Sequence, residues 1–266
     1  MKDKNNTESQ TIGIGVITYN RVDCLAKTIK KIKENTNHSY EIIVADDGSS
    51  DDTRLFLEEN EINYVTGQNK GISWNKNRAL FYLNNFTQAD LYFIIEDDSY
   101  PIEPEWEAPW VEALHLWGHI NLLPPWYQDK IVGGAGVPQD PYICRSLTAQ
   151  VSAFTKEVIS YCGYYDTRFK HYGFEHADHT IRIVKAGYGG RPIPTENPHE
   201  ADFFYLSHGF SVDTGHSYYD EAHVAANGRV LDEVIKDEIH RPAWRGDDEM
   251  KEFRREITEA LRRRSS

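Results

Sequence analysis

The sequence has few cysteines and no long apolar stretch, and these absences exclude several classes of protein. Cys24, Cys144 and Cys162 are odd in number, far apart and without a CxxC pair. This pattern fits neither a disulfide framework nor a zinc site, so we expect three buried, reduced side chains in a reducing compartment. No apolar run approaches the roughly 20 residues that span a bilayer, and the polar N-terminus does not resemble a signal peptide. We therefore expect a cytoplasmic protein without a transmembrane segment.

Positive charge is also scarce. The chain has 42 acidic and 29 basic residues, which gives a formal net charge of −13. Such a balance weakens any general attraction to nucleic acid or anionic membranes. The hydrophobic fraction of 39% and the aromatic fraction of 12% are those of a globular protein. A length of 266 residues fits one large domain, or a core domain with an added segment.

Strand and helix patterns alternate after a polar lead-in at residues 1–10, which we expect to be disordered. Apolar, β-branched stretches predict strands at 12–19, 41–45, 62–65 and 91–95, and amphipathic patterns predict helices at 22–34, 54–59 and 72–85. This alternation implies right-handed βαβ units and a largely parallel sheet, and so an α/β fold. In such sheets, ligands bind beyond the carboxyl ends of the strands.

The pattern changes after Pro101. Helices are predicted at 105–118, 155–161, 175–186 and about 247–264, and IVGGAGVP predicts a strand with a glycine bend. Residues 209–228 are rich in glycine, serine and tyrosine, so we expect a flexible segment that closes over a ligand. The last helix ends in three arginines, which either guide an anionic acceptor or complement the helix C-terminus.

The segment FIIEDDSYP carries the strongest local signal. An apolar strand runs directly into Glu96, Asp97 and Asp98. Three adjacent carboxylates repel one another unless a cation compensates them. Mg²⁺ and Mn²⁺ take oxygen ligands, usually one or two carboxylates together with substrate phosphates. The segment therefore indicates either a divalent metal site or a solvated acidic turn.

A second acidic turn follows the second strand in VADDGSSDDT. Asp46 and Asp47 lie just past the strand, where a carboxylate can accept the imide N–H of uracil or a ribose hydroxyl. The alternative is an Asx turn that leads into a helix N-cap. Both acidic turns should meet at the same edge of a parallel sheet.

Five motifs in order resemble the GT-A glycosyltransferases of family 2 and their relatives. They are VITYNR, VADDGSSDDT, NKGISWNKNRAL, FIIEDDSYP and GYYDTRFKHYGFEHADHTIRIVKAGY, and they extend over residues 12–188. The resemblance implies a GT-A core with helices flanking a mostly parallel sheet and a C-terminal helical extension. It implies a catalytic domain at 11–210, with a nucleotide-binding half at 11–100 and an acceptor half at 101–210, followed by a C-terminal segment at 211–266.

The activity that the resemblance implies is metal-dependent transfer of a sugar from a nucleotide-diphosphate donor, a UDP-sugar by preference, to an acceptor hydroxyl with inversion. It places Asp46 against the uracil edge. It places Lys76 where the family has arginine, and lysine lacks the planar fork of that residue, so Arg78 is the alternative base or phosphate contact. The residues expected around the nucleotide sugar are Thr18, Asn20, Arg21, Asp46, Asp47, Lys76, Arg78, Glu96 and Asp97.

The resemblance also implies a metal site and an acceptor site. Asp98, with Asp97 and a late histidine at His208, is expected to hold Mn²⁺ or Mg²⁺, while Glu96 touches the ribose. Glu175, His176 and Asp178 are the candidates for the catalytic base, and we rank Glu175 first. Asp178 is alternatively half of an ion pair with Arg182, four residues along a helix. The tryptophans of 106–117 are expected in the core, and Trp126 is expected as an acceptor platform.

Two other functions compete with this reading. A sugar nucleotidyltransferase would carry a glycine-rich phosphate loop after the first strand, where this chain has Thr-Tyr-Asn-Arg. A non-catalytic carbohydrate or nucleotide-sugar binding protein on the same fold is suggested by His176, which stands where the family has aspartate. The acceptor is open among a glycan, a lipid-linked sugar, a protein and a nucleic acid.

Overall fold

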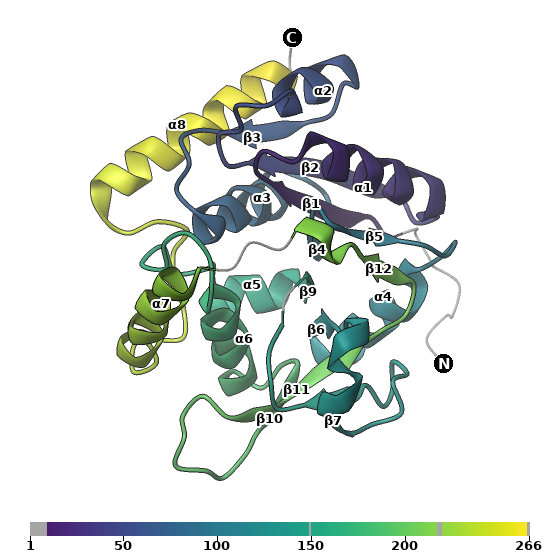
Figure 1. Ribbon diagram of the computed structural model, residues 1–266, viewed down its shortest axis with the longest axis vertical. Coiled ribbons are helices and arrows are strands. Elements are labelled where there is room, and N and C mark those ends of the chain that lie inside the picture. Colours follow the sequence, from purple (N-terminus) through teal and green to yellow (C-terminus); the bar gives the residue numbers. More distant parts are fainter. Residues whose placement is uncertain (1–9, 149, 217–219, 265–266) are drawn as a thin grey trace, which may run out of the picture.

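A ten-stranded sheet runs through the computed structural model, which describes residues 10–148, 150–216 and 220–264 (Figure 1). The strand order is β3-β2-β1-β4-β9-β6-β11-β8-β7, and β10 pairs with β11. The strands are β1 (Ile12–Thr18), β2 (Tyr40–Asp46), β3 (Tyr64–Thr66), β4 (Leu91–Glu96), β6 (His119–Leu122), β7 (Ile131–Gly133), β8 (Tyr142–Cys144), β9 (Val151–Thr155), β10 (Gly190–Pro192) and β11 (Ala201–Leu206).

The four strands β3, β2, β1 and β4 are parallel, which confirms the predicted α/β architecture. β9 then runs antiparallel between β4 and β6, and the far part of the sheet is mixed. A separate two-stranded sheet joins β5 (Ser99–Pro101) to β12 (Phe210–Val212). The carboxyl ends of β1 and β4 therefore lie side by side, as the sequence predicted.

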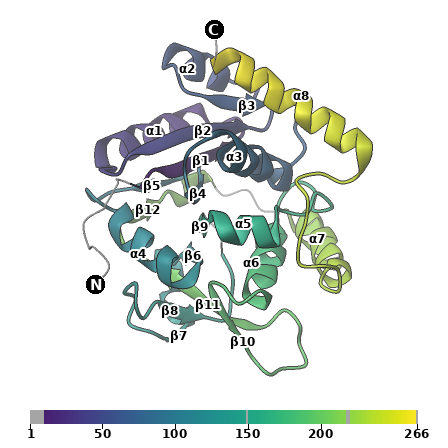
Figure 2. The same cartoon turned by 180° about the vertical axis from the view of Figure 1, so that it is seen from behind.

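Helices cover both faces of the sheet (Figures 1 and 2). Side chains of α1 and the start of α4 bury one face of β1 and β4, while those of α3, α5 and α8 bury the other. Gly15 permits the close approach of α3, because a Cβ there would lie 2.8 Å from that of Ala79. The helices are α1 (Val22–Asn35), α2 (Thr53–Glu59), α3 (Ile72–Phe86), α4 (Glu107–Trp117), α5 (Lys156–Cys162), α6 (Glu175–Lys185), α7 (Glu221–Val234) and α8 (Gly246–Arg264), with 3-10 helices η1 (Pro125–Lys130) and η2 (Thr214–His216).

The segment at 209–228, which was predicted to be flexible, contains regular structure over most of its described residues. Phe210–Val212 form β12, and α7 begins at Glu221 after an N-cap in which the Asp220 carboxylate accepts the backbone N–H groups of Ala222 and His223. Glycine and tyrosine content suggested mobility, but pairing with β5 and the cap supply regular structure. Residues 217–219 of this prediction lie outside the described residues.

Most of the expected core residues are confirmed, while Trp117 is partly buried against the core. Trp106 and Trp110 are fully buried, and the three cysteines are buried and free. The basic end of α8 lies against β3, where the Arg263 guanidinium is 4.3 Å from the ring centroid of Tyr64. Within the described part of the chain, no helix combines the length and apolar character needed to cross a membrane.

Candidate functional site

A cavity of about 750 Å³ opens beyond the carboxyl ends of β1 and β4. The two acidic turns, the start of α3 and the start of α6 all contribute side chains to its wall. Its lining residues that can take part in chemistry are Thr18, Tyr19, Arg21, Asp47, Asn69, Asn75, Glu96, Asp98, Trp126, Thr148, Gln150, His171, Tyr172, Glu175, His176, Asp213, Thr214 and His223. The sequence-based expectation that both acidic turns meet at one sheet edge is thus confirmed.

The EDD turn divides its three carboxylates between the cavity and the interior. Glu96 and Asp98 line the cavity, whereas the Asp97 side chain is fully buried. The strand ends at Glu96, and the turn at 97–98 directs Asp97 into the interior and Asp98 back to the cavity. Asp97 accepts a hydrogen bond of 2.7 Å from the Thr18 hydroxyl, and burial raises the pKa of Asp97 to about 7 despite the charge of Arg21. Asp97 therefore anchors the neighbouring strand end instead of facing a ligand.

Arg21 joins the first strand's loop to the acidic turn. Its guanidinium lies 2.6 Å from Asp97 Oδ1 and 3.0 Å from Asp98 Oδ2. Among the described residues that line the cavity, Arg21 is the only lysine or arginine. A ligand with two or more negative charges would consequently find no other lysine or arginine in that lining.

The second acidic turn places Asp47, not Asp46, on the cavity. Asp46 is fully buried, where it accepts hydrogen bonds from the Ser49 backbone (3.0 Å) and the Thr66 hydroxyl (2.7 Å). The prediction that Asp46 contacts a nucleobase does not fit this placement, because one carboxylate oxygen is bonded within the turn and the other to β3. Asn20 also lies off the cavity lining, since its side-chain oxygen accepts from the Ser50 backbone at 2.7 Å.

Lys76 lies between the EDD turn and the start of α6. Its ammonium is 3.2 Å from Glu96 Oε1 and 3.1 Å from Glu175 Oε1, and its side chain is 1% exposed. Burial opposes the charged state, but Glu175 and Glu96 outweigh it and raise the pKa of Lys76. The predicted direct base or phosphate contact does not match this placement, because Lys76 is bonded to two carboxylates that themselves line the cavity.

Arg78 is likewise an interior residue and not a ligand contact. Its guanidinium is fully buried and bonded to Asp47 and to Glu256 of α8. The expectation that Arg78 replaces the arginine of the family at a nucleotide is therefore not supported by its position. Arg78 contacts the cavity lining through its ion pair with Asp47.

Glu175 and His176 open α6 at the cavity wall. Phe174 precedes them with a left-handed φ of 64°, and this turn directs the first residues of α6 toward the cavity. Burial would favour protonation of Glu175, but Lys76 and His176 outweigh it and hold the pKa of Glu175 well below its ordinary range. Both residues therefore remain candidates for a base, with Glu175 ionised.

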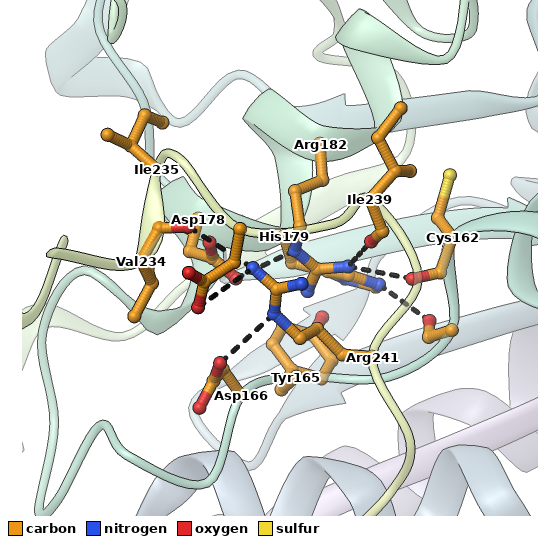
Figure 3. A network of polar contacts seen from close by, with 12 residues as sticks. Cys162, Tyr165, Asp166, Asp178, His179, Arg182, Val234, Ile235, Ile239 and Arg241 are labelled. Atoms are coloured by element: carbon orange, nitrogen blue, oxygen red, sulfur yellow. Dashed lines mark hydrogen bonds and ion pairs between the residues drawn. The ribbon is translucent and has the colours of Figure 1, made fainter.

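Asp178 lies away from the cavity, within a buried network (Figure 3). Its carboxylate accepts from Arg182 Nε at 2.9 Å, and Arg182 also donates to the carbonyls of Cys162, Tyr164 and Ile239. This confirms the predicted Asp178–Arg182 ion pair. Asp178 lies almost one helical turn beyond Glu175, is not part of the cavity lining, and has its carboxylate committed to Arg182.

His208 does not reach the cavity lining. It lies in the turn between β11 and β12, is 49% exposed, and approaches Glu103 at 3.4 Å. Its carbonyl accepts the indole N–H of Trp110, which fixes the turn against α4. The predicted His208 ligand to the metal is therefore not supported by this arrangement.

Several cavity residues were not identified from the sequence. His171 and His223 stack with ring centroids 3.8 Å apart, and they bring the loop before α6 into contact with α7. Thr148 and Gln150, which precede β9 in the chain, also line the cavity. His171 stands only four residues before Glu175 in KHYGFEH, and that proximity was a usable signal. Trp126, which was predicted, lies on the cavity wall with 44% exposure.

The chemistry of the acidic turn fits a divalent cation that is completed by a substrate. Asp98 offers a cavity-facing carboxylate, which is the oxygen donor that Mg²⁺ and Mn²⁺ prefer. Within the described residues, no group of three or more histidine, cysteine, aspartate or glutamate side chains forms a complete metal site. One or two carboxylates with substrate phosphates are the usual arrangement for Mg²⁺, so the residues present fit that mode of binding.

Comparison with known families matches residues 14–133 to the family model "Glycosyl transferase family 2". A curated relative, the GalNAc(5)-diNAcBac-PP-undecaprenol beta-1,3-glucosyltransferase of Campylobacter jejuni, is 29% identical over 147 residues. The alignment covers 50% of this chain and 46% of that protein. The chain therefore spans about half the length of that relative.

Solved structures share the fold at low sequence identity. GalNAc-T7 with UDP, GalNAc and Mn²⁺ has a TM-score of 0.65 at 15% identity, covering 95% of this chain and 55% of that one. The mannosyltransferase PcManGT from Pyrobaculum calidifontis, with GDP-Man and Mn²⁺, has a TM-score of 0.52 at 18% identity, covering 66% and 52%. These likenesses establish the GT-A fold for the chain.

Proposed function

Because residues 14–133 carry a glycosyl transferase family 2 region on a GT-A fold, we propose that this protein is a metal-dependent glycosyltransferase. It takes a sugar from a nucleotide-diphosphate donor, with UDP-sugars preferred, and attaches it to an acceptor hydroxyl with inversion. The UDP and GDP-Man bound in the structural neighbours support this donor class. The acceptor is a molecule that presents a hydroxyl near Glu175.

One observation carries the proposal. Asp98, from the EDD turn, and Glu175, at the start of α6, line the same cavity at the carboxyl edge of the sheet. A direct displacement at an anomeric carbon requires a group that holds the donor and a base that accepts the proton of the acceptor hydroxyl. Asp98 and the ionised Glu175 supply these two groups in the same cavity. Asp47 and Asn69 line the part of the wall that follows β2 and β3, where the nucleoside would lie.

The charges of the site support metal dependence. Five described carboxylates line the cavity (Asp47, Glu96, Asp98, Glu175 and Asp213), and Arg21 is already shared between Asp97 and Asp98. A diphosphate brought to this wall would meet net negative charge. When bound at Asp98, Mg²⁺ or Mn²⁺ would act as a Lewis acid that neutralises charge on the departing nucleotide.

The remaining steps are carried by the chain's own residues. Glu175 accepts the proton of the attacking hydroxyl, and His176, 3.4 Å from it, is the alternative acceptor. Lys76 keeps Glu175 ionised. Trp126, which is 44% exposed and lines the same cavity, offers an apolar face to the acceptor.

We expect one nucleotide sugar from a panel of UDP-, GDP- and dTDP-sugars to be hydrolysed slowly when Mn²⁺ or Mg²⁺ is present. Glycosyltransferases of this design let water replace the acceptor, and EDTA should suppress nucleotide release at least about tenfold because the Lewis acid is removed. The measurement is the nucleotide released over hours, with heat-treated protein as the control. No release and no thermal stabilisation by any donor would favour a non-catalytic binding protein. Pyrophosphate released when the protein is given a nucleoside triphosphate and a sugar 1-phosphate instead would favour a nucleotidyltransferase.

A further inference from the structure

The C-terminal helix α8 lies along the nucleotide-binding half of the molecule, beside α3 and β3 (Figures 1 and 2). Phe253, Ile257 and Ala260 of α8 belong to the same core cluster as the side chains of α3. The same helix also directs two acidic side chains, Glu252 and Glu256, toward the loop that follows β3. A helix that served only to cover the sheet would not need buried charge at this position.

Glu256 forms a two-point contact with Arg78. Its Oε1 is 2.9 Å from Nη2, its Oε2 is 2.9 Å from Nε, and Oε2 also accepts the indole N–H of Trp74 at 3.0 Å. Both partners of the ion pair are at most 2% exposed, so the interaction is charge-assisted and shielded from water. Gly67 makes room for it, because a Cβ at position 67 would overlap the Glu256 carboxylate.

Arg78 passes this contact on to the cavity wall. Its Nη1 donates to Asp47 Oδ1 at 2.8 Å, and its Nη2 donates to the carbonyl of Gln68 at 2.9 Å. Asp47 in turn accepts the backbone N–H groups of Lys70 (3.0 Å) and Gly71 (2.9 Å). The loop at 67–71 is therefore fixed to Asp47 and to Arg78 at the same time.

Glu252 adds a second attachment one helical turn before Glu256. Its carboxylate is 2.8 Å from the ammonium of Lys70. Asp47, Asn69 and Gly71, which the two glutamates hold in place through these contacts, all line the cavity. Nothing in α8 itself touches the cavity, so any effect of this helix on a ligand must be indirect.

We propose that α8 positions the donor site. Through Glu256 and Arg78 it fixes Asp47 and the loop at 67–71 in the position that receives the nucleoside of the donor. The inference rests on the proposed function. Glu256 and Arg78 are positioning residues, and the C-terminal helix is thereby required for donor affinity in addition to stability.

The test is a Glu256→Gln variant, which keeps the shape of the side chain and removes its charge. We expect UDP, titrated with Mn²⁺ into folded protein, to bind at least about tenfold more weakly, because Asp47 and its loop lose their fixed position. Without any ligand, the amides of Lys70 and Gly71 should exchange with deuterium faster. A Glu259→Gln variant is the matched control: Glu259 is on the same helix, half-exposed, and only 4.0 Å from Arg255.

A Trp74→Phe variant separates positioning from stability. It removes the indole contact to Glu256 but leaves the Arg78 bridge, so it should lower the melting temperature with little change in UDP affinity. If Glu256→Gln does not fold, Glu252→Gln replaces it, with a loss of about two- to threefold expected because that ion pair is partly solvated. UDP affinity and amide exchange that match those of wild type would overturn the inference. Failure of the wild-type protein to bind any nucleotide contradicts the proposed function instead.

Discussion

The Asp98→Asn variant should lose donor hydrolysis by about 10³-fold, or about 4 kcal/mol of transition-state stabilisation. Asp98 is the EDD carboxylate next to Arg21 that faces the cavity, and the amide removes the charge that would attract a divalent cation. Nucleotide release from the preferred donor, measured at saturating Mn²⁺, gives the result. The fold should be retained, because the side chain is partly exposed and loses one contact to Arg21.

The control for this variant is Asp248→Asn. Asp248 lies in the first turn of α8, is fully exposed, and has only a 3.8 Å contact to Lys251. The Asp248→Asn substitution removes the same charge at a position outside the cavity lining, so it should leave the hydrolysis rate unchanged. Hydrolysis by Asp98→Asn above about a tenth of the wild-type rate would show that this carboxylate is not the principal metal ligand.

The Lys76→Met variant should combine lost activity with a changed pH profile. It leaves Glu96 and Glu175 without their shared cation, and breaking a buried ion pair in this way costs about 3–5 kcal/mol of unfolding free energy. In the wild type, Lys76 keeps the pKa of Glu175 below its ordinary range, so Glu175 stays ionised as the pH falls toward that depressed pKa. Without the ammonium, burial raises that pKa, and the acid limb of the rate profile should move to higher pH.

The measurement is the hydrolysis rate between pH 5 and pH 9, together with urea unfolding. Lys31→Met is the control, because Lys31 pairs with Glu34 on the surface. This variant should leave the acid limb of the rate profile in place and change the free energy of unfolding by no more than about 1 kcal/mol. In a Glu175→Gln variant the loss of activity should not depend on pH. An unchanged acid limb in Lys76→Met would contradict the assignment of Glu175 as the base and of Lys76 as the residue that positions it.

The elements of the first hundred residues could be predicted because each has a local cause. The apolar run of β1, the amphipathic period of α1 and the acidic turn after β4 are all readable within a short window, and the parallel pairing of β1 with β4 then brings Thr18 close to Asp97. The far half was less predictable. β6 and β9 were missed because short, fully buried antiparallel strands have no alternating pattern.

The differences between the predicted and the observed positions of the site residues share one physical cause. Asp46, Lys76 and Arg78 are polar residues that a motif assigns to a ligand, but each is buried and bonded to other residues of the chain, and Lys76 and Arg78 have partners that are distant in the sequence. The partner of Lys76 is 99 residues away, at Glu175, and that of Arg78 is 178 residues away, at Glu256. A local pattern identifies which residues belong near the site; it does not tell which of them face the cavity and which support those that do.

The most direct test of the account is the binding of nucleoside diphosphates to the wild-type protein by calorimetry, with Mn²⁺ and again with EDTA. UDP, GDP and dTDP are titrated in turn. We predict that one of them, UDP by preference, binds with Mn²⁺ and that EDTA weakens the binding at least about tenfold, because only the metal offsets the charge of the diphosphate at this acidic wall. Binding that is equally strong in EDTA, or no binding of any of the three to folded protein, would contradict a metal-dependent donor site.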